Sequence, residues 1–137
     1  MSSYLLDTCV WSDIIRRRSP ALISKFSKLK AGQVFLSPIV MGELMVGYYK
    51  GDQTPQRKLV IDTLLTHASR LQIDDAVANR YAQVRSCLEG LGTPIGRNDT
   101  WIAAEALHHG LIMVTDNTQE FARVDGLRLE NWMQRAD

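Results

Sequence analysis

The sequence predicts an α/β fold in which helices flank a short, mostly parallel central sheet. Short apolar runs alternate along the chain with longer segments of helical pattern, and this alternation is typical of that fold class. Parallel strands need crossover connections of a dozen or more residues, and the helical segments are long enough to supply them. With 137 residues, no internal repeat and no Pro/Gly/Ser-rich linker, the chain is expected to form a single domain over residues 1–137.

The first half of the chain is divided by capping signals. Tyr4-Leu5-Leu6 is a short apolar run that predicts a strand ending at Asp7. A Ser-Pro pair at 19–20 and another at 37–38 each favour a helix start, because serine suits the N-cap and proline suits the first turn. We therefore predict a strand at 4–6, helices at 8–17 and 20–29, a strand at 34–36, and helices from 38 to about 49 and at 56–69.

The second half follows the same alternation. Gly90-Leu91-Gly92 is expected to stop one helix, Asn98 to cap the next, and Gly110 to end it. We predict a strand at 71–73, helices at 74–89 and 99–109, a buried strand at 111–115, a short helical turn at 118–121 and an edge strand at 127–129.

Composition excludes several classes of protein. The 16 basic and 15 acidic residues leave a net charge of +1, so the overall charge gives no indication of a nucleic-acid partner. Cys9 and Cys87 form neither a disulfide framework nor a zinc spacing; Cys9 is expected in the core and Cys87 to be partly buried. No signal peptide and no apolar run of membrane-spanning length is present, which favours a soluble, cytoplasmic protein without a membrane partner.

The positions of the acidic residues are the most informative feature. Asp7 and Asp116 each follow directly after a predicted strand, and Asp99 lies in the first turn of a predicted helix. Ligands of open α/β sheets bind beyond the carboxyl ends of the strands, where such side chains gather. Glu43 is the only charged residue between Lys30 and Lys50, in a helix that is apolar almost all round and therefore expected to be largely buried.

If these four acids converge, they predict a metal site. Two unit charges 4 Å apart repel by about 4 kcal/mol at an effective dielectric of about 20, so the acids must be protonated or neutralised by cations. Oxygen-only ligands suit Mg²⁺ or Mn²⁺, and such ions activate water for phosphodiester hydrolysis. The residues therefore favour a nuclease with Asp7, Glu43, Asp99 and Asp116 as catalytic candidates.

Other interpretations stay open at this point. Asp7 and Asp99 also suit helix caps, Asp116 suits a plain turn, and Glu43 suits a buried pair with an arginine. The chain would then be a metal-free interaction module. A phosphatase-like hydrolase with Asp7 as nucleophile is a further alternative, although Cys9 stands where a second aspartate would be expected.

Five segments resemble the PIN domain, in its VapC-type toxin branch. They read Leu-Leu-Asp-Thr at 5–8, Gly-Glu-Leu at 42–44, Pro-Ile-Gly-Arg-Asn-Asp-Thr-Trp-Ile-Ala-Ala at 94–104, Leu-Ile-Met-Val-Thr-Asp-Asn-Thr-Gln-Glu-Phe at 111–121 and Gly-Leu-Arg-Leu-Glu-Asn-Trp at 126–132. The resemblance extends from about Leu5 to Trp132. It implies a PIN-like fold and a Mg²⁺- or Mn²⁺-dependent endoribonuclease of a type II toxin–antitoxin pair, which blocks translation by cutting tRNA or rRNA.

The resemblance also assigns roles to residues. Asp7, Glu43 and Asp99 fall on the family's first three acidic positions, and Asp7 and Asp99 are the main metal ligands it implies. The fourth position falls on Asp116 or Asn117. Cys9 replaces an asparagine that relatives often carry, and Thr8 and Thr115 are expected to help orient the ligands.

Partners are expected as well. The resemblance implies an RNA substrate, a homodimer and a VapB-type antitoxin whose C-terminal segment occupies the active-site groove. The helices at 20–29 and 38–49 could line a groove for an apolar antitoxin segment, with Met41, Met45, Tyr48 and Tyr49 as its apolar residues, unless these side chains are simply core. Candidate RNA-binding cations on the rim are Arg16–Arg18, Lys50, Arg97 and Arg123.

Overall fold

Five short strands form one sheet in which every pairing is parallel. The computed structural model describes residues 2–133, and its strand order is β3-β2-β1-β4-β5. The strands are β1 Tyr4–Leu6, β2 Val34–Leu36, β3 Ser69–Arg70, β4 Ile112–Val114 and β5 Leu129–Glu130. β1 lies at the centre and pairs with β2 and β4. The predicted α/β class and mostly parallel sheet are therefore confirmed.

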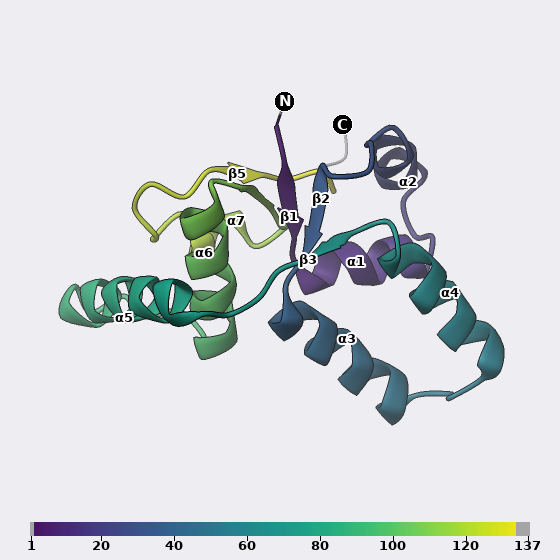
Figure 1. Cartoon of the computed structure of the whole chain (residues 1–137), viewed down its shortest axis with the longest axis horizontal. Coiled ribbons are helices and arrows are strands. Elements are labelled where there is room, and N and C mark those ends of the chain that lie inside the picture. Colours follow the sequence, from purple (N-terminus) through teal and green to yellow (C-terminus); the bar gives the residue numbers. More distant parts are fainter. Residues whose placement is uncertain (1, 134–137) are drawn as a thin grey trace.

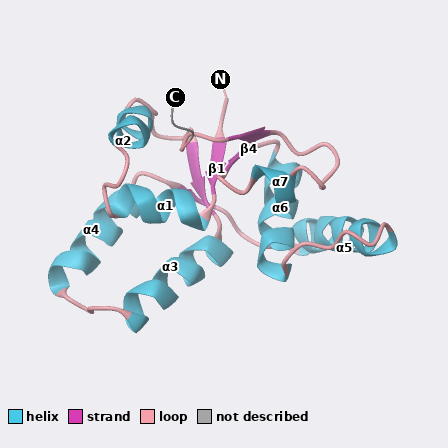
Figure 2. Cartoon of the chain, turned by 180° about the vertical axis from the view of Figure 1, so that it is seen from behind, coloured by secondary structure: helices cyan, strands magenta, loops and turns pink. Residues whose placement is uncertain are grey.

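In the described part of the chain, seven helices surround this sheet. They are α1 Thr8–Ile15, α2 Pro20–Ser27, α3 Pro38–Lys50, α4 Pro55–Leu65, α5 Asp75–Gly90, α6 Arg97–His109 and α7 Thr118–Phe121. In Figure 1, α5–α7 lie to one side of the strands and α2 and α4 to the other, and Figure 2 shows the same division from behind. α1 and α3 begin at the lower edge of the sheet, where β1 and β2 end (Figure 1). No helix within residues 2–133 is long and apolar enough to cross a membrane.

The central strands are buried on both faces, as parallel strands between helices must be. Leu5, Leu6, Met113 and Val114 have no exposed surface. Leu6 lies opposite Val114 in the parallel register, so β1 and β4 end side by side. The residues that follow the two strands therefore emerge next to each other.

Differences from the predicted elements concentrate at polar boundaries. The helix predicted at 56–69 ends at Leu65, and the strand predicted at 71–73 is instead β3 at Ser69–Arg70. Both β3 residues are exposed, so no apolar pattern marks this edge strand. Asn98 was predicted to cap α6, but the helix already begins at Arg97. Gly96 therefore occupies the N-cap position, and Asn98 lies within the first turn.

Candidate active site

Asp7 is held at the junction of β1, α1 and β4. Its backbone N–H donates to the carbonyl of Val114, 2.9 Å away, which continues the pairing of β1 with β4. Its Oδ1 accepts from the N–H of Thr8 at 2.8 Å, and its Oδ2 accepts from the hydroxyl of Thr115 at 2.8 Å. Asp7 therefore caps α1 with one oxygen, as the capping interpretation expected, and presents the other toward the sheet edge. Thr8 and Thr115 do orient it.

Burial raises the pKa of Asp7 above 3.8, although the bonds from Thr115 and Thr8 oppose this. The negative charges of Glu43 and Asp116 raise the pKa of Asp7 further. Only 8% of the residue is exposed, so water screens this repulsion weakly. The surroundings therefore disfavour the ionised form of Asp7, and a cation nearby would favour that form.

Glu43 enters the same site from α3. Its Oε1 accepts from the Thr8 hydroxyl at 2.5 Å, and its Oε2 accepts from the Asn98 side-chain amide at 3.5 Å. Among residues 2–133 the ion pairs are Lys58–Asp62 and Arg85–Glu89, so the alternative of a Glu43–arginine pair is not met there. Polar hydrogen bonds, rather than a salt bridge, position this carboxylate.

The prediction that the Glu43 helix is largely buried was wrong. α3 buries Val40, Leu44 and Tyr48, but Val46 and Tyr49 on its other face are 52% and 61% exposed. The helix projects from the sheet together with α4, so one of its faces meets solvent although its residues are apolar (Figure 1). Glu43 itself is half-buried.

Asp99 reaches the site from the first turn of α6. Its pKa is raised from 3.8 to about 6, first by burial and then by the charges of Asp7, Glu120 and Glu43. Gly96 lies against it, since a Cβ at that position would be 3.4 Å from the Asp99 carboxylate. Asp99 is not the N-cap of α6, so its capping interpretation does not hold.

Glu120 is a carboxylate of this site that the sequence interpretation missed. It extends from α7, where its Oε2 accepts from the Asn117 amide at 2.6 Å and its Oε1 accepts from the Gly96 N–H at 3.4 Å. Its charge contributes more than that of Glu43 to the raised pKa of Asp99. The available signal was its spacing from Asn117, which places the two side chains one helical turn apart.

The two candidates for the fourth acidic position lie differently from expectation. Asp116 is exposed, and its Oδ1 accepts from the Cys9 thiol at 3.1 Å. The Asn117 amide is engaged with Glu120. The structure thus brings Asp7, Glu43 and Asp99 together, places Glu120 beside Asp99, and leaves Asp116 at the rim next to Asp7.

The expectation for Cys87 was wrong, and that for Cys9 was met only in part, because Cys9 packs against the core without being fully buried. Cys9 is half-buried at the edge of the site, because α1 turns its Sγ toward Asp116, and it lies 3.8 Å from Asp7 Oδ2. Burial and the charges of Asp7 and Asp116 raise the pKa of its thiol to about 12. Cys87 is exposed rather than partly buried.

Glu105 is a second acid that the sequence did not single out. It has no exposed surface, its Oε1 accepts from the Ser37 hydroxyl at 2.5 Å, and its Oε2 has no hydrogen-bond partner. Burial raises its pKa from 4.5 to about 7. Because Ser37 caps α3 and Glu105 lies on α6, this bond ties together the two helices that carry Glu43 and Asp99.

The carboxylates suit a hard divalent cation by their chemistry. The donors are oxygens, and the like charges around Asp99 and Asp7 raise both pKa values, a repulsion that a cation would relieve. Within the described residues the side chains do not close on one point: no three of the Asp, Glu, His or Cys groups lie close enough together to hold an ion as they stand. The side chains would have to move closer together to form a ligand set.

Known proteins resemble the chain over nearly its whole length. The profile of the PIN domain family matches residues 4–127. The tRNA(fMet)-specific endonuclease VapC of Shigella flexneri is 38% identical over 133 residues, covering 96% of this chain and 99% of the relative. The Ribonuclease VapC2 of Haemophilus influenzae is 35% identical and covers 97% and 100%.

Solved structures agree with these matches. The DNA-bound VapBC of Salmonella typhimurium matches with a TM-score of 0.88 and 30% identity, over 96% of this chain and 99% of the other. VapBC2 of Rickettsia felis, bound to a promoter DNA fragment, matches with a TM-score of 0.87 and 29% identity, over 94% and 98%.

Proposed function

Since the chain belongs to the PIN domain family, in its VapC ribonuclease branch, we propose that it is a metal-dependent endoribonuclease toxin whose site holds Mg²⁺ or Mn²⁺. One observation carries the metal proposal. Asp7 and Asp99 come from a strand end and a helix start far apart in sequence, and the charge of Asp7 is among the causes that raise the pKa of Asp99. Two carboxylates in this relation favour a shared cation.

The site residues would have different roles in RNA hydrolysis. Asp7 and Asp99 would hold the ion, and Glu43, held by Thr8 and Asn98, would complete its surroundings together with Glu120. When bound, the ion supplies positive charge at the scissile phosphate and lowers the pKa of water. Asp116, at the exposed rim, is a weaker candidate, and so is Asn117, whose amide is already engaged.

The substrate and antitoxin follow from the relatives. The Shigella flexneri relative is named for cutting tRNA(fMet), and the solved neighbours are VapBC toxin–antitoxin complexes. We therefore include an RNA substrate, with tRNA as the first class to test and rRNA as the second, and a VapB-type antitoxin.

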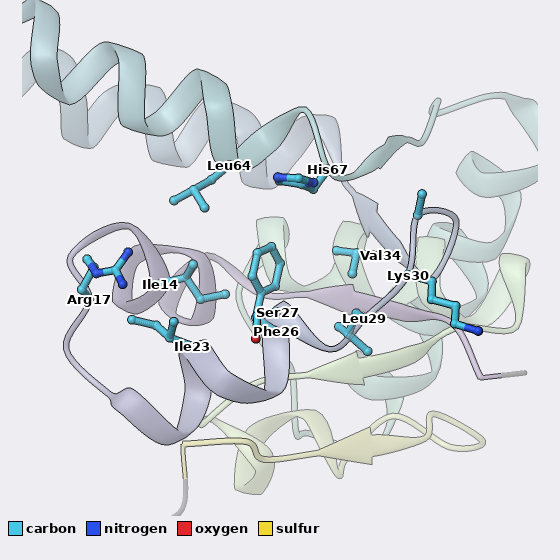
Figure 3. Close-up of a pocket in the computed structure, with 11 residues that line it drawn as sticks. Ile14, Arg17, Ile23, Phe26, Ser27, Leu29, Lys30, Val34, Leu64 and His67 are labelled. Atoms are coloured by element: carbon cyan, nitrogen blue, oxygen red, sulfur yellow. The ribbon is translucent and has the colours of Figure 1, made fainter.

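An apolar cavity offers a place for an antitoxin segment. It has a volume of about 430 Å³ and is lined by Ile14 of α1, Ile23 and Phe26 of α2, and Leu64 of α4 (Figure 3). The groove was expected between the helices at 20–29 and 38–49, and only the first of these lines this cavity. α2 contributes to the cavity, but its other walls come from α1, β2 and α4, because α3 projects away from this side.

The four α3 residues that were expected to line the apolar groove differ in their burial. They are Met41, Met45, Tyr48 and Tyr49. Tyr48 is buried in the core, as the alternative interpretation expected, and Met41 and Met45 pack partly against it. Tyr49 is exposed on α3, as is Val46 on the same helix and Leu59 on α4. We assign these exposed apolar side chains to the predicted homodimer.

The rival functions receive less support. A metal-free interaction module needs the acids as caps, but Asp99 does not cap α6 and Asp7 uses only one oxygen to cap α1. A phosphatase-like hydrolase needs a second aspartate two residues after Asp7, and Cys9 holds that position, where its thiol donates a hydrogen bond to Asp116.

The proposal is tested with Asp7→Asn and Asp99→Asn, with Asp52→Asn in an exposed turn as the matched control. Each site variant should lose more than about 100-fold of its Mn²⁺-dependent cleavage of total tRNA, because even residues that merely support metal ligands cost about 10–100-fold. Calorimetric titration should show Mn²⁺ binding to wild type and Asp52→Asn only. Wild-type cleavage by both site variants would contradict the proposal.

A further inference from the structure

Two adjoining hollows lead away from the acidic site between α1, α3 and α4. The inner hollow, of about 80 Å³, is lined at one end by Thr8 and Glu43. The outer hollow, of about 520 Å³, lies toward the N-terminal end of α4. Both are lined by Ile15, Arg16 and Arg57, so they lie side by side, and we call the two hollows together the basic groove.

Three arginines give this groove its charge. Arg16 and Arg57 line both hollows, and Arg18 lines the outer one. None of the three forms an ion pair among residues 2–133. Arg57 is half-buried in this setting, although burying a charge without an opposite charge is unfavourable. The unpaired cations beside an acidic site therefore suit an anionic ligand that approaches the carboxylates.

The backbone at the end of α1 separates three consecutive arginines. Arg17 adopts a left-handed conformation with φ of 52°, which residues other than glycine rarely do. As a result Arg17 lines the apolar cavity near Ile14 and Ile23 (Figure 3), whereas Arg16 and Arg18 line the basic groove.

Other cations predicted for the rim lie elsewhere. Arg97 lines a separate hollow that also contains the Arg85–Glu89 ion pair. Arg123 donates to the carbonyl of Pro94. Lys50, at the end of α3, lines neither hollow of the basic groove.

We propose that the basic groove binds the phosphates of a single RNA strand next to the bond that is cut, with Arg16 and Arg57 nearest the carboxylates and Arg18 farther out. The proposal rests on the ribonuclease function above. A net charge of +1 provides no global attraction for RNA, and the carboxylates repel it, so local cations must hold the strand. Arginine suits this task because its guanidinium binds phosphate in a bidentate manner. The small volume of the inner hollow, about 80 Å³, favours a single strand over a duplex.

The test measures binding of a fluorescent 12-nucleotide oligouridine by anisotropy, in EDTA so that no cleavage occurs. For a single strand, the slope of log K against log salt is about −0.7 for each phosphate neutralised. The variant Arg16→Gln/Arg18→Gln/Arg57→Gln should therefore flatten the slope by about 2. Its affinity at 50 mM salt should fall more than about tenfold.

A matched control removes three exposed cations outside the groove: Lys25→Gln/Lys28→Gln/Arg80→Gln. It should change the slope by less than about 0.7, the contribution of one phosphate contact. Arg18→Gln alone should flatten the slope by about 0.7, and melting temperatures near that of wild type will show that each variant is folded. In Mn²⁺, the groove variant should raise KM with kcat almost unchanged, since it removes binding rather than chemistry.

Three outcomes would overturn the groove proposal. The groove and control variants could flatten the slope equally, the groove variant could bind RNA as wild type does, or it could lose only its affinity for a VapB-type antitoxin. The ribonuclease proposal fails separately: wild type would then show no Mn²⁺-dependent cleavage, while the salt slopes would still report whether the arginines bind RNA.

Discussion

Helix α6 carries two acids with raised pKa values in opposite surroundings. Asp99, in the first turn, is half-buried among the charges of Asp7, Glu120 and Glu43, and its pKa is about 6. Glu105, farther along, is fully buried with one hydrogen bond from Ser37, and its pKa is about 7. The shifts have the same direction, but only Asp99 owes part of its shift to neighbouring anions.

The difference separates an acid whose pKa a bound cation would change from an acid that is sealed in the core. A cation near Asp99 would remove the like-charge repulsion and lower its pKa, so its protonation is coupled to binding. Burial alone holds the pKa of Glu105 up, and no ligand can reach it. We interpret Glu105 as a structural tie between α6 and the start of α3.

The largest expected effect concerns metal stabilisation. Mn²⁺ at a hundredfold excess over its Kd should stabilise wild type and Glu105→Gln by about 3 kcal/mol, because it binds only the folded state. Asp99→Asn should show almost none of this gain, while its metal-free form is more stable than wild type because repulsion is reduced. Thermal melts with and without Mn²⁺ measure both quantities. If Mn²⁺ stabilised all three proteins equally, Asp99 would have no more part in metal binding than Glu105.

The next prediction concerns pH. The pKa of Glu105 is raised on folding from 4.5 to about 7, so the folded state binds the proton more tightly than the unfolded state. Its contribution to stability is full below pH 4.5 and is lost as pH rises through 7, by about 3 kcal/mol in total. Urea unfolding at pH 5 and pH 8 should show that wild type loses more stability over this range than Glu105→Gln does. Equal losses would mean that Glu105 is ionised in the folded protein.

A smaller effect is expected at the tie itself. Ser37→Ala removes the cap of α3 and the one hydrogen bond that the Glu105 carboxyl group makes among residues 2–133, so it should cost about 2–3 kcal/mol. Ser19→Ala, which removes only the cap of α2, should cost about 1 kcal/mol. In a double-mutant cycle, Glu105→Met, which has a similar size but no oxygen to accept the Ser37 hydroxyl, should reduce the cost of Ser37→Ala. Similar costs for the two serines would argue against the tie.

The smallest effect concerns the two thiols. Cys9 lies within the field of Asp7 and Asp116, and its pKa of about 12 leaves about one molecule in ten thousand as thiolate at pH 8. Cys87 is exposed on α5. Iodoacetamide at pH 8 should therefore alkylate Cys87 well before Cys9, as mass spectrometry of the digested protein can show. Faster labelling of Cys9 would mean that burial and the charges of Asp7 and Asp116 do not raise the pKa of its thiol.

Several features of this protein could be predicted from the sequence by itself. The strands at Tyr4–Leu6, Val34–Leu36 and Ile112–Val114 are apolar because they are buried on both faces, so their composition records their position. Asp7 and Asp99 could be placed at the site because acids after a strand or at a helix start lie at the functional edge of a parallel sheet. These inferences need only local patterns and one rule of topology.

Other features were decided by the tertiary structure alone. β3 consists of exposed residues and is a strand only because β2 offers it an edge. Glu120 joins the site because α7 folds back toward Gly96, and Glu105 is sealed because α6 packs against the start of α3. A carboxylate has the same local signature in water, in a cluster or in the core. What it does here depends on neighbours that are distant in sequence, since desolvation and Coulomb forces act through space rather than along the chain.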